Sequence, residues 1–552
     1  MDGNRIPLES IGYDGRFISR DYAFADFTDH AAIVNHIPLA AFSDYPFSYR
    51  NACVGVVLAN GTPGGNELVS RYRALGAPLL FEVADGRVQP WAIGPKDAKT
   101  VGDAFAVDQI ERVFAKNKAH WKPKVLGRVR TPSDVKSNPQ LDFFDLGLRP
   151  LLEQFFQTKL KDLLERAFEA TADRYKSVHG QDPPVTFLFP YLFRFVTAKI
   201  FMDRADAEGW DGLDSPRKIF EKAEKHAGAD LLKRLPKGFL DHRVLEKAWS
   251  SISQTLQFQN LSVPDLAFIY ESSFITEKTR KELGIHSTPR GLAEYIVNHL
   301  PWQDIPVNER RVFEPFGGHG IFLACAMERL GEDLDVGWGP KRRHDYFSKM
   351  LVGVEKDALA IEVCRLMLTL SDYPNANSWQ LHLEDMFTWT GWDAALKSAP
   401  VVLANPPYEA FPEDERRRID AVKAQPPSEF LRRLMRQPPL MLGLVLPQSF
   451  LTSPFYREAN RQIAIRYEHV SIVELPRIFR YPDNETIALM ASGRRDKGNN
   501  VSVSYAEVLR HEVEPFLQDF KGTCLPSPAW KKPWFHERIK AFFCEPNTNN
   551  IV

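Results

Sequence analysis

The fold is decided by the stretch Arg311-Val-Phe-Glu-Pro-Phe-Gly-Gly-His-Gly-Ile-Phe-Leu-Ala324. It begins as an apolar strand, passes through a glycine-rich turn and opens a helix. Gly317, Gly318 and Gly320 permit backbone torsions and a close approach that a Cβ would block. Because no Gly-Lys-Ser/Thr follows, the turn is not the phosphate loop of a nucleoside triphosphatase. The pattern indicates the first strand and turn of a cofactor-binding sheet.

Further strands follow this one. Between residues 284 and 490 strands and helices alternate, which predicts an open, mostly parallel sheet with helices on both faces. We expect residues 331–346 to form an inserted surface loop and a helix to run from Asp357 through Leu370. In such sheets ligands bind across the carboxyl ends of the strands, so the polar residues that end each strand should face one crevice.

Two acidic residues end the next two strands. Glu355 closes Met350-Leu-Val-Gly-Val-Glu355, where a carboxylate accepts both ribose hydroxyls of an adenosine cofactor. Asp385 closes the third strand and could accept the adenine amino group, while Met386 or Phe387 packs on the ring. Taken alone, Asp385 is more simply a turn residue or a helix N-cap. As the third of four strand ends, it is predicted to be a ligand.

The fourth strand, Val401-Val-Leu-Ala404, delivers Asn405-Pro406-Pro407-Tyr408. The prolines lack N–H groups and have fixed φ, so the backbone is stiff and its carbonyls stay available as acceptors. The Asn405 oxygen and the Pro406 carbonyl can hold the two hydrogens of an exocyclic amino group, and Tyr408 offers a flat face to a ring. By itself the motif could be an ordinary strand exit. In this context it predicts a pocket for an extruded purine.

Together these motifs resemble the S-adenosylmethionine-dependent N6-adenine DNA methyltransferases over residues 265–500, particularly type I and type IIG restriction-modification and related phage-defence methylases. Thr288-Pro289 matches the family's Thr-Pro segment, which lines the methionine end of the cofactor. Ser287 stands where the family usually has an aromatic residue. The order of the segments is that of the gamma arrangement. The resemblance implies a Rossmann-like methyltransferase sheet, preceded by a small α/β domain and a helical domain.

The resemblance also assigns site residues and an activity. S-adenosyl-L-methionine is expected to contact Thr288, Pro289, Glu314, Pro315, Gly317, Gly318, Gly320, Glu355, Asp385, Met386 and Asn405. The catalytic residues are expected to be Asn405, Pro406, Pro407, Tyr408 and, as the second ring over the base, Phe479. Phe479 could equally be a core residue at a strand end. The implied enzyme is an adenine-specific DNA methyltransferase that needs no general base before transfer. The alternatives are methylation of RNA or a protein glutamine, or a non-catalytic cofactor-binding subunit.

Basic residues crowd the segment after the motif. They are Arg416, Arg417, Arg418, Lys423, Arg432, Arg433 and Arg436. Such a run is usually a solvated face. Beside an extrusion site, contact with the phosphates of double-stranded DNA is the better interpretation.

Composition sets the remaining limits. The 552 residues carry 70 lysines and arginines against 71 aspartates and glutamates, so any nucleic-acid surface must be a local patch. The five cysteines form no Cys-x-x-Cys pair, which suits a reducing cytoplasm and argues against a metal site. Charges interrupt every long apolar stretch and no signal peptide starts the chain, so neither a membrane span nor a membrane partner is expected.

Four segments are predicted. Residues 1–130 form an α/β docking or binding domain, since Ala84 stands where a nuclease's Glu-x-Lys motif would place its lysine after Glu82. Residues 131–270 form a helical domain, 271–500 the catalytic domain, and 501–552 a carboxyl-terminal extension. That extension is shorter than the target-recognition region of the resembled enzymes. Either the chain is truncated, or recognition is loose, or another subunit reads the sequence. We favour the last, with other subunits of a restriction-modification or defence complex as partners.

Overall fold

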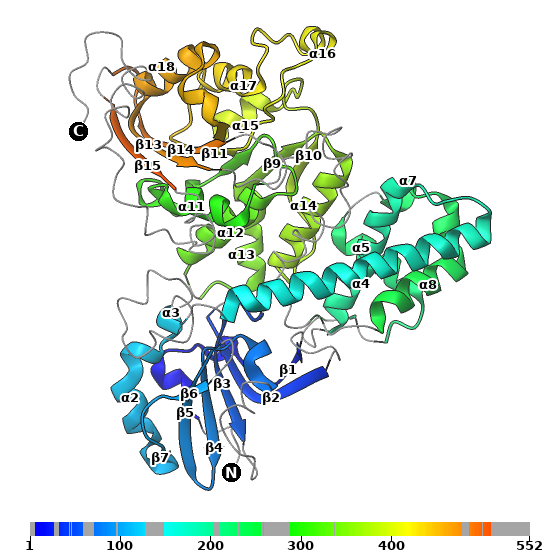
Figure 1. Ribbon diagram of the computed structural model, residues 1–552, viewed down its shortest axis with the longest axis vertical. Helices are drawn as coiled ribbons and strands as arrows, with labels where there is room; N and C mark the ends of the chain where they lie inside the picture. Colours follow the sequence, from blue (N-terminus) through cyan, green and yellow to red (C-terminus); the bar gives the residue numbers. More distant parts are fainter. Residues whose placement is uncertain are drawn as a thin grey trace. The chain divides into compact units, whose positions relative to one another are not determined.

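The computed structural model falls into two units, Met1–Phe274 and Ile275–Val552, which are described separately (Figure 1). The structure describes residues 6–26, 33–43, 45, 47–58, 71–94, 98–126, 148–203, 209–210, 212–228, 231–254, 258, 288–335, 337–476, 485–498 and 501–508. Phe479 and the carboxyl-terminal residues from 509 onward lie outside these ranges, as does the segment before Thr288.

The first unit contains a seven-stranded sheet with the order β1-β2-β3-β4-β5-β6, and β7 pairs with β5. The strands are β1 (Ile18–Asp26), β2 (Ile33–Phe42), β3 (Ala52–Leu58), β4 (Leu79–Ala84), β5 (Arg87–Ile93), β6 (Ala98–Thr100) and β7 (Phe105–Ala106). Strands β4 and β5 form an antiparallel hairpin, and Asp85 and Gly86 both have positive φ in its turn. Glu82 on β4 accepts a hydrogen bond from Trp91 Nε1 on β5 at 2.8 Å, so its carboxylate links the two strands of the hairpin.

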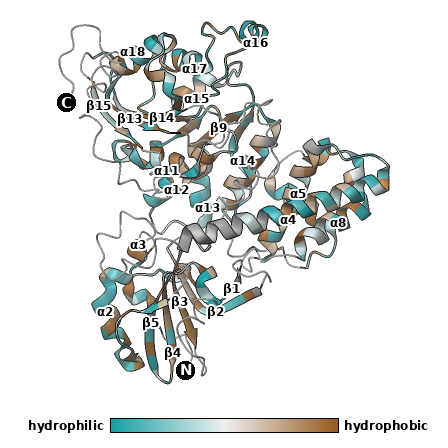
Figure 2. Cartoon of the chain, viewed as in Figure 1, coloured by the Kyte–Doolittle hydropathy of each residue, from teal (hydrophilic) through white to brown (hydrophobic). Residues whose placement is uncertain are grey.

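Helices form the rest of the first unit. They are α2 (Ile110–Trp121), α3 (Pro123–Leu126), α4 (Leu148–His179), α5 (Val185–Asp203), α6 (Pro216–Ala227), α7 (Leu231–Arg234) and α8 (His242–Ser253). A buried ion pair joins two of them, with Arg194 Nε of α5 lying 2.6 Å from Glu224 Oε2 of α6. Figure 2 shows the strands of this unit coloured mainly as hydrophobic. Among the described residues, no helix combines the length and apolar character needed to cross a membrane.

The second unit is built on an eight-stranded sheet with the order β10-β9-β8-β11-β12-β14-β13-β15. Its strands are β8 (Val312–Glu314), β9 (Leu351–Glu355), β10 (Gln380–Leu383), β11 (Val401–Ala404), β12 (Met441–Pro447), β13 (Tyr467–Leu475), β14 (Thr486–Arg494) and β15 (Ser502–Glu507). The five strands from β10 to β12 are parallel, and β14 runs antiparallel to both its neighbours.

Helices cover both faces of this sheet (Figure 1). The helices of this unit are α11 (Arg290–His299), α12 (Ile321–Glu332), α13 (Pro340–Met350), α14 (Ala358–Ser371), α15 (Trp392–Ser398), α16 (Glu413–Arg418), α17 (Pro426–Leu434) and α18 (Arg457–Arg466). Of these, α16 buries no side chain and lies away from the sheet. The chain builds β8, β9 and β10 outward on one side and then returns to add β11 on the other. The fold is therefore the predicted Rossmann-like methyltransferase sheet, with its switch point between β8 and β11.

The prediction of a surface loop over residues 331–346 is wrong, because α13 occupies much of it. Its buried side chains are His344, Tyr346, Phe347 and Met350, which lie on one helical face. Pro340 begins the helix at a position where its missing N–H costs nothing. The lysine and arginine residues on the opposite face obscured this periodicity in the sequence.

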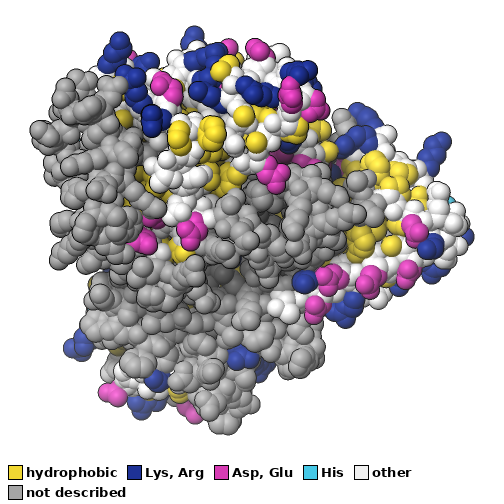
Figure 3. Space-filling view, turned by 45° about the horizontal axis from the view of Figure 1, so that its top comes forward, with side chains coloured by type: hydrophobic (Ala, Val, Ile, Leu, Met, Phe, Trp, Pro, Cys, Tyr) yellow, Lys and Arg dark blue, Asp and Glu magenta, His cyan; other side chains and the backbone are white. Residues whose placement is uncertain are grey.

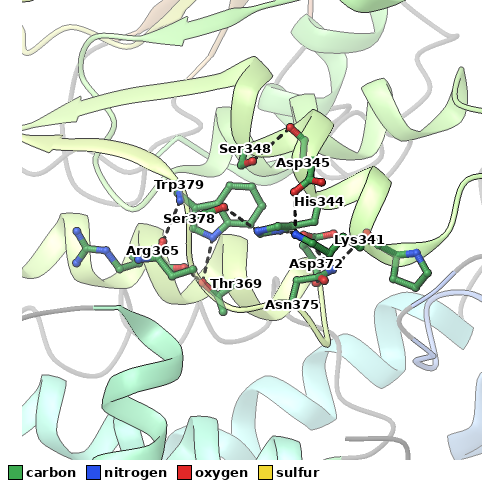
Figure 4. Close-up of polar contacts among 12 residues, drawn as sticks. Lys341, His344, Asp345, Ser348, Arg365, Thr369, Asp372, Asn375, Ser378 and Trp379 are labelled. Atoms are coloured by element: carbon green, nitrogen blue, oxygen red, sulfur yellow. Dashed lines mark hydrogen bonds and ion pairs between the residues drawn. The ribbon is translucent and has the colours of Figure 1, made fainter. Parts of the chain in front are cut away.

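A buried polar cluster fastens α13 to the connection between α14 and β10 (Figure 4). His344 Nδ1 lies 2.5 Å from Asp372 Oδ2, and Ser378 Oγ lies 2.7 Å from His344 Nε2. Burial raises the pKa of Asp372, while the hydrogen bond from His344 opposes that shift. The serine, histidine and aspartate are hydrogen-bonded in the same sequence as in an acyl-transfer triad. However, the nearby backbone N–H of Trp379 is bonded to Asn377 Oδ1, so it is not available to an oxyanion.

We therefore interpret the cluster as structural and expect His344→Ala to lower the free energy of unfolding by about 2–3 kcal/mol, because Asp372 would stay buried without its imidazole partner. Lys341→Ala on the same helix is the control: its side chain is 84% exposed and pairs with the exposed Asp345, so the change should stay within about 0.5 kcal/mol. Urea unfolding measures both. Equal losses in the two variants would contradict a structural role for His344.

Candidate functional site

The candidate site lies where four adjacent parallel strands end. In the order β10-β9-β8-β11, their carboxyl ends share one edge of the sheet. Glu355 ends β9, Asp385 follows β10, and Asn405 follows β11. Glu314 ends β8 directly before the glycine-rich turn. The structure thus brings these predicted residues to the same edge, on both sides of the switch point.

The glycine-rich turn is held against β9. The N–H of Gly317 donates to the Val354 carbonyl at 2.8 Å. Gly318 and Gly320 have φ values of +49° and +80°, in the region that favours glycine. A Cβ on Gly320 would lie 2.3 Å from Cys364 Sγ, whereas a Cβ on Gly318 would meet nothing within 4 Å. The turn is therefore packed closely against α14 at Gly320 and is open at Gly318.

Glu355 is oriented by two backbone donors. Its Oε2 accepts from the Gly318 N–H at 2.8 Å, and its Oε1 accepts from the Asp357 N–H at 2.7 Å. Burial raises the pKa of Glu355, although both hydrogen bonds oppose this shift. A carboxylate offers about four acceptor positions, so two such bonds orient it and leave capacity for ligand hydroxyls.

Glu314 lies deeper than the other acidic residues. It is buried, and its Oε2 accepts from the N–H of Leu323 in the first turn of α12 at 3.3 Å. Burial raises the pKa of Glu314 well above its ordinary value. This carboxyl therefore supports the start of α12 beneath the turn.

Asp385 makes a contact that the sequence did not predict. Its Oδ1 accepts from the Phe387 N–H at 3.0 Å, which is the turn role considered for it. Its Oδ2 accepts from Arg418 at 3.0 Å, across 33 residues of sequence. A residue assigned to the cofactor is thus paired with one assigned to DNA. The adjacent Met386 is buried in the hydrophobic core.

Asn405 is held at both ends of its amide. Its Nδ2 donates to Thr288 Oγ1 at 3.0 Å, and its Oδ1 accepts from the Tyr408 hydroxyl at 2.9 Å. Thr288 is buried directly before Pro289, the N-cap of α11. Burial, and after it the phenol of Tyr456, raises the pKa of Tyr408 well above its ordinary value, so this hydroxyl remains a donor at neutral pH. Sequence reasoning did not single out Tyr456.

The basic residues after Asn405 fall into two groups. Arg416 donates to the carbonyls of Ala421 and Val422. Arg417 pairs with Glu413 on α16, and its side chain is 77% exposed. Arg418 lies 3.0 Å from Asp385 and 3.6 Å from Glu415, and its side chain is 56% exposed. Arg417 and Arg418 are therefore exposed to solvent, each beside an acidic partner.

Arg432 and Arg433 on α17 have a different setting. Both donate to Glu429, whose side chain is fully buried, and Arg433 also donates to the carbonyl of Ile419 at 2.8 Å. Burial raises the pKa of Glu429, but the hydrogen bonds from both arginines outweigh it and lower that pKa overall. These two arginines thus compensate a buried charge, and their contact with DNA stays a prediction.

No protein-family model matches this chain, and no curated protein matches it. Among solved structures the chain is similar to DrdV in a complex with DNA, with 12% identity over 94% of this chain and 55% of that chain and a TM-score of 0.48. It is similar to a putative class I S-adenosylmethionine-dependent methyltransferase from Listeria monocytogenes (16% identity, 65% of this chain, 99% of that chain, TM-score 0.38). It is also similar to the methyltransferase subunit of a type I restriction-modification system from Streptococcus thermophilus (13% identity, 67% of this chain, 93% of that chain, TM-score 0.41). The chain spans about half the length of DrdV.

Proposed function

We propose that this chain transfers a methyl group from S-adenosyl-L-methionine to the N6 amino group of adenine in double-stranded DNA. Its setting is a restriction-modification or phage-defence system with other subunits. The observation that carries the proposal is the amide of Asn405, fixed between Thr288 and Tyr408 where β11 ends. An acceptor held in this way is suited to an exocyclic amino group.

The residues around the glycine-rich turn fit the cofactor. The space above Gly318 admits a ligand close to the backbone, and Glu355 is oriented for the ribose hydroxyls. Asp385 and Met386 stand at the next strand end for the adenine, and Thr288 lies toward Asn405 for the methionine end. When bound, the cofactor supplies an electrophilic methyl group on its sulfonium.

Asn405 and Pro406 act on the adenine amine. The N6 lone pair is delocalised into the ring, which makes the nitrogen a poor nucleophile. Hydrogen bonds from its two protons to the Asn405 oxygen and the Pro406 carbonyl favour a pyramidal nitrogen whose lone pair points outward. With N6 held in this way, its lone pair would accept the methyl group that the bound cofactor supplies, and the cationic N6 would then pass one proton to solvent water. Fixed acceptors need no reorganisation during this step.

Tyr408 has two successive contacts in this scheme. Its hydroxyl occupies the Asn405 oxygen in the observed structure, so it marks the position that an adenine N–H donor would take. Entry of the base displaces the hydroxyl, and the aromatic ring is then available to stack on the purine. Pro407 keeps the backbone between them stiff. Phe479 remains the proposed second ring.

Asn405→Ala is expected to lower the rate of methyl transfer by at least about 100-fold, because it removes a preorganised acceptor, while cofactor affinity stays within a few-fold. The measurement is transfer of a labelled methyl group to DNA, RNA or protein, followed by nucleoside analysis. Asn375→Ala in the α14–β10 connection is the matched control and should transfer at nearly the normal rate. Normal formation of N6-methyladenine by Asn405→Ala would refute the proposal.

Cofactor affinity should weaken as the pH falls through the raised pKa of Glu355, because the protonated carboxyl loses acceptor capacity. Calorimetric titration with S-adenosylmethionine between alkaline and mildly acidic pH measures this. Glu355→Gln should bind more weakly and show a flatter pH profile. Glu384→Gln, an exposed neighbour, should keep the wild-type profile. A wild-type affinity independent of pH would reject ionised Glu355 as the ribose ligand.

Arg417→Gln should weaken DNA binding similarly for all sequences and reduce the slope of log K against log salt by about 1, because one phosphate contact is lost. Arg342→Gln is the control, since Arg342 lies over the Trp338 ring at 3.9 Å on α13. Fluorescence anisotropy over a range of salt concentrations compares the two. An unchanged slope in Arg417→Gln would remove this residue from the DNA surface.

A further inference from the structure

Exposed apolar side chains of the second unit gather at the edge that carries the site. Among the described residues of this unit, the large hydrophobic residues with exposed side chains are Leu383, Val422 and Phe455, at 49%, 58% and 69%. Leu383 ends β10, Val422 follows α16 after β11, and Phe455 follows β12. Single exposed apolar residues are common, but these three all follow strands that end at one edge of the sheet.

Phe455 stands next to the pocket wall. Because β12 is parallel to β11, with Leu444 opposite Ala404, β12 runs past the level of Asn405 and ends at Pro447, at the same edge of the sheet. Phe455 lies in the short 3-10 helix Pro454–Tyr456. Its neighbour Tyr456 is buried and close enough to raise the pKa of Tyr408. Consecutive Cα atoms are 3.8 Å apart. The exposed residue Phe455 is therefore directly adjacent to Tyr456, the residue that lies against Tyr408.

The backbone of Phe455 is held from both sides. Its N–H donates to Ser453 Oγ at 3.3 Å, and its carbonyl accepts from Ser428 Oγ at 3.1 Å. The ring of Tyr456 packs against Phe450, with centroids 5.1 Å apart. An exposed aromatic ring on an anchored corner loses little conformational freedom when it binds a partner.

Exposed arginines accompany the exposed ring. Arg457 is exposed two residues after Phe455 and is followed by the exposed Glu458, and Arg417 on α16 is 77% exposed while paired with Glu413. Figure 3 shows basic, acidic and apolar side chains interleaved over the upper part of the view, where Figure 1 places α16, α17 and α18. Aromatic residues set among basic ones suit nucleic acid, because bases stack on the ring while cations meet phosphates.

We propose that the ring of Phe455 enters the base stack of duplex DNA at the position that the extruded adenine vacates. This inference rests on the proposed function. Extruding a base breaks its stacking and leaves a gap, and an apolar ring inserted there restores contact with the flanking bases. Phe455 then has a different role from Tyr408. Tyr408 contacts the extruded base inside the pocket, and Phe455 contacts the base pairs that flank the vacated position in the duplex.

The test compares binding to two duplexes of the same mixed sequence, one intact and one with a single tetrahydrofuran abasic site. The full chain is titrated at fixed salt with S-adenosylmethionine present, and fluorescence anisotropy gives both affinities. The wild type should bind the abasic duplex about tenfold more tightly, because the gap is already open to the ring. Phe455→Ala should bind the two duplexes about equally, and Phe455→Trp should retain the preference.

Two controls make the result specific. Val422→Ala removes another exposed apolar side chain at the same edge and should keep the preference for the abasic duplex. Asn405→Ala should also keep it, because an abasic site presents no base for Asn405 to hold. The inference is overturned if the wild type shows no preference, if Phe455→Ala retains it, or if Val422→Ala abolishes it equally.

This experiment separates the two proposals because it does not depend on methyl transfer. A preference that depends on Phe455, in a chain that methylates no DNA, would refute the proposed function and leave the insertion intact. Methylation of adenine without any such preference would refute the insertion alone.

Discussion

The parallel pairing of β8 with β9 on one side and β11 on the other is the constraint on which the rest of the second unit depends. Parallel strands end at the same edge, so residues far apart in the chain meet there without any direct connection. Gly318 and Glu355 are 37 residues apart, yet they are joined by a 2.8 Å hydrogen bond where β8 and β9 end. A shift in the pairing of β8 with β11 would separate the glycine-rich turn from the Asn405 corner.

The order and type of the strands in this unit could be predicted because each carries local signals. Apolar runs marked the strands, glycines marked the turn, and Asp357 marked the helix it caps, since its Oδ1 accepts from the Ala360 N–H at 2.7 Å. The helix α13 was missed because its apolar positions are few and its other face is densely charged. Its stability comes from burial of residues such as Phe347 and from the His344–Asp372 pair, which only the tertiary structure provides.

The positions of the site residues could be predicted, but their mutual contacts could not. A strand end fixes where Asp385 or Asn405 stands, whereas the partner of each depends on loops that return from elsewhere in the chain. Arg418 reaches Asp385 because α16 follows the Asn405 corner. The arginines of α17 looked similar to those of α16 in the sequence. The structure distinguishes them, because Arg432 and Arg433 surround a carboxylate that is buried.

The Arg418–Asp385 pair links the two proposed ligands, because Asp385 is proposed to bind the cofactor and Arg418 to bind DNA. In the observed state one Asp385 oxygen accepts from Arg418 and the other from the backbone of Phe387. If the cofactor's adenine amino group donates to Asp385 Oδ2, it must share that oxygen with Arg418 or displace the arginine. A displaced guanidinium, already more than half exposed, then loses one of its two acidic partners and keeps Glu415, which lies 3.6 Å away. Because coupling between two ligands is reciprocal, any gain in DNA affinity from the displaced Arg418 must appear equally as a gain in cofactor affinity when DNA is bound.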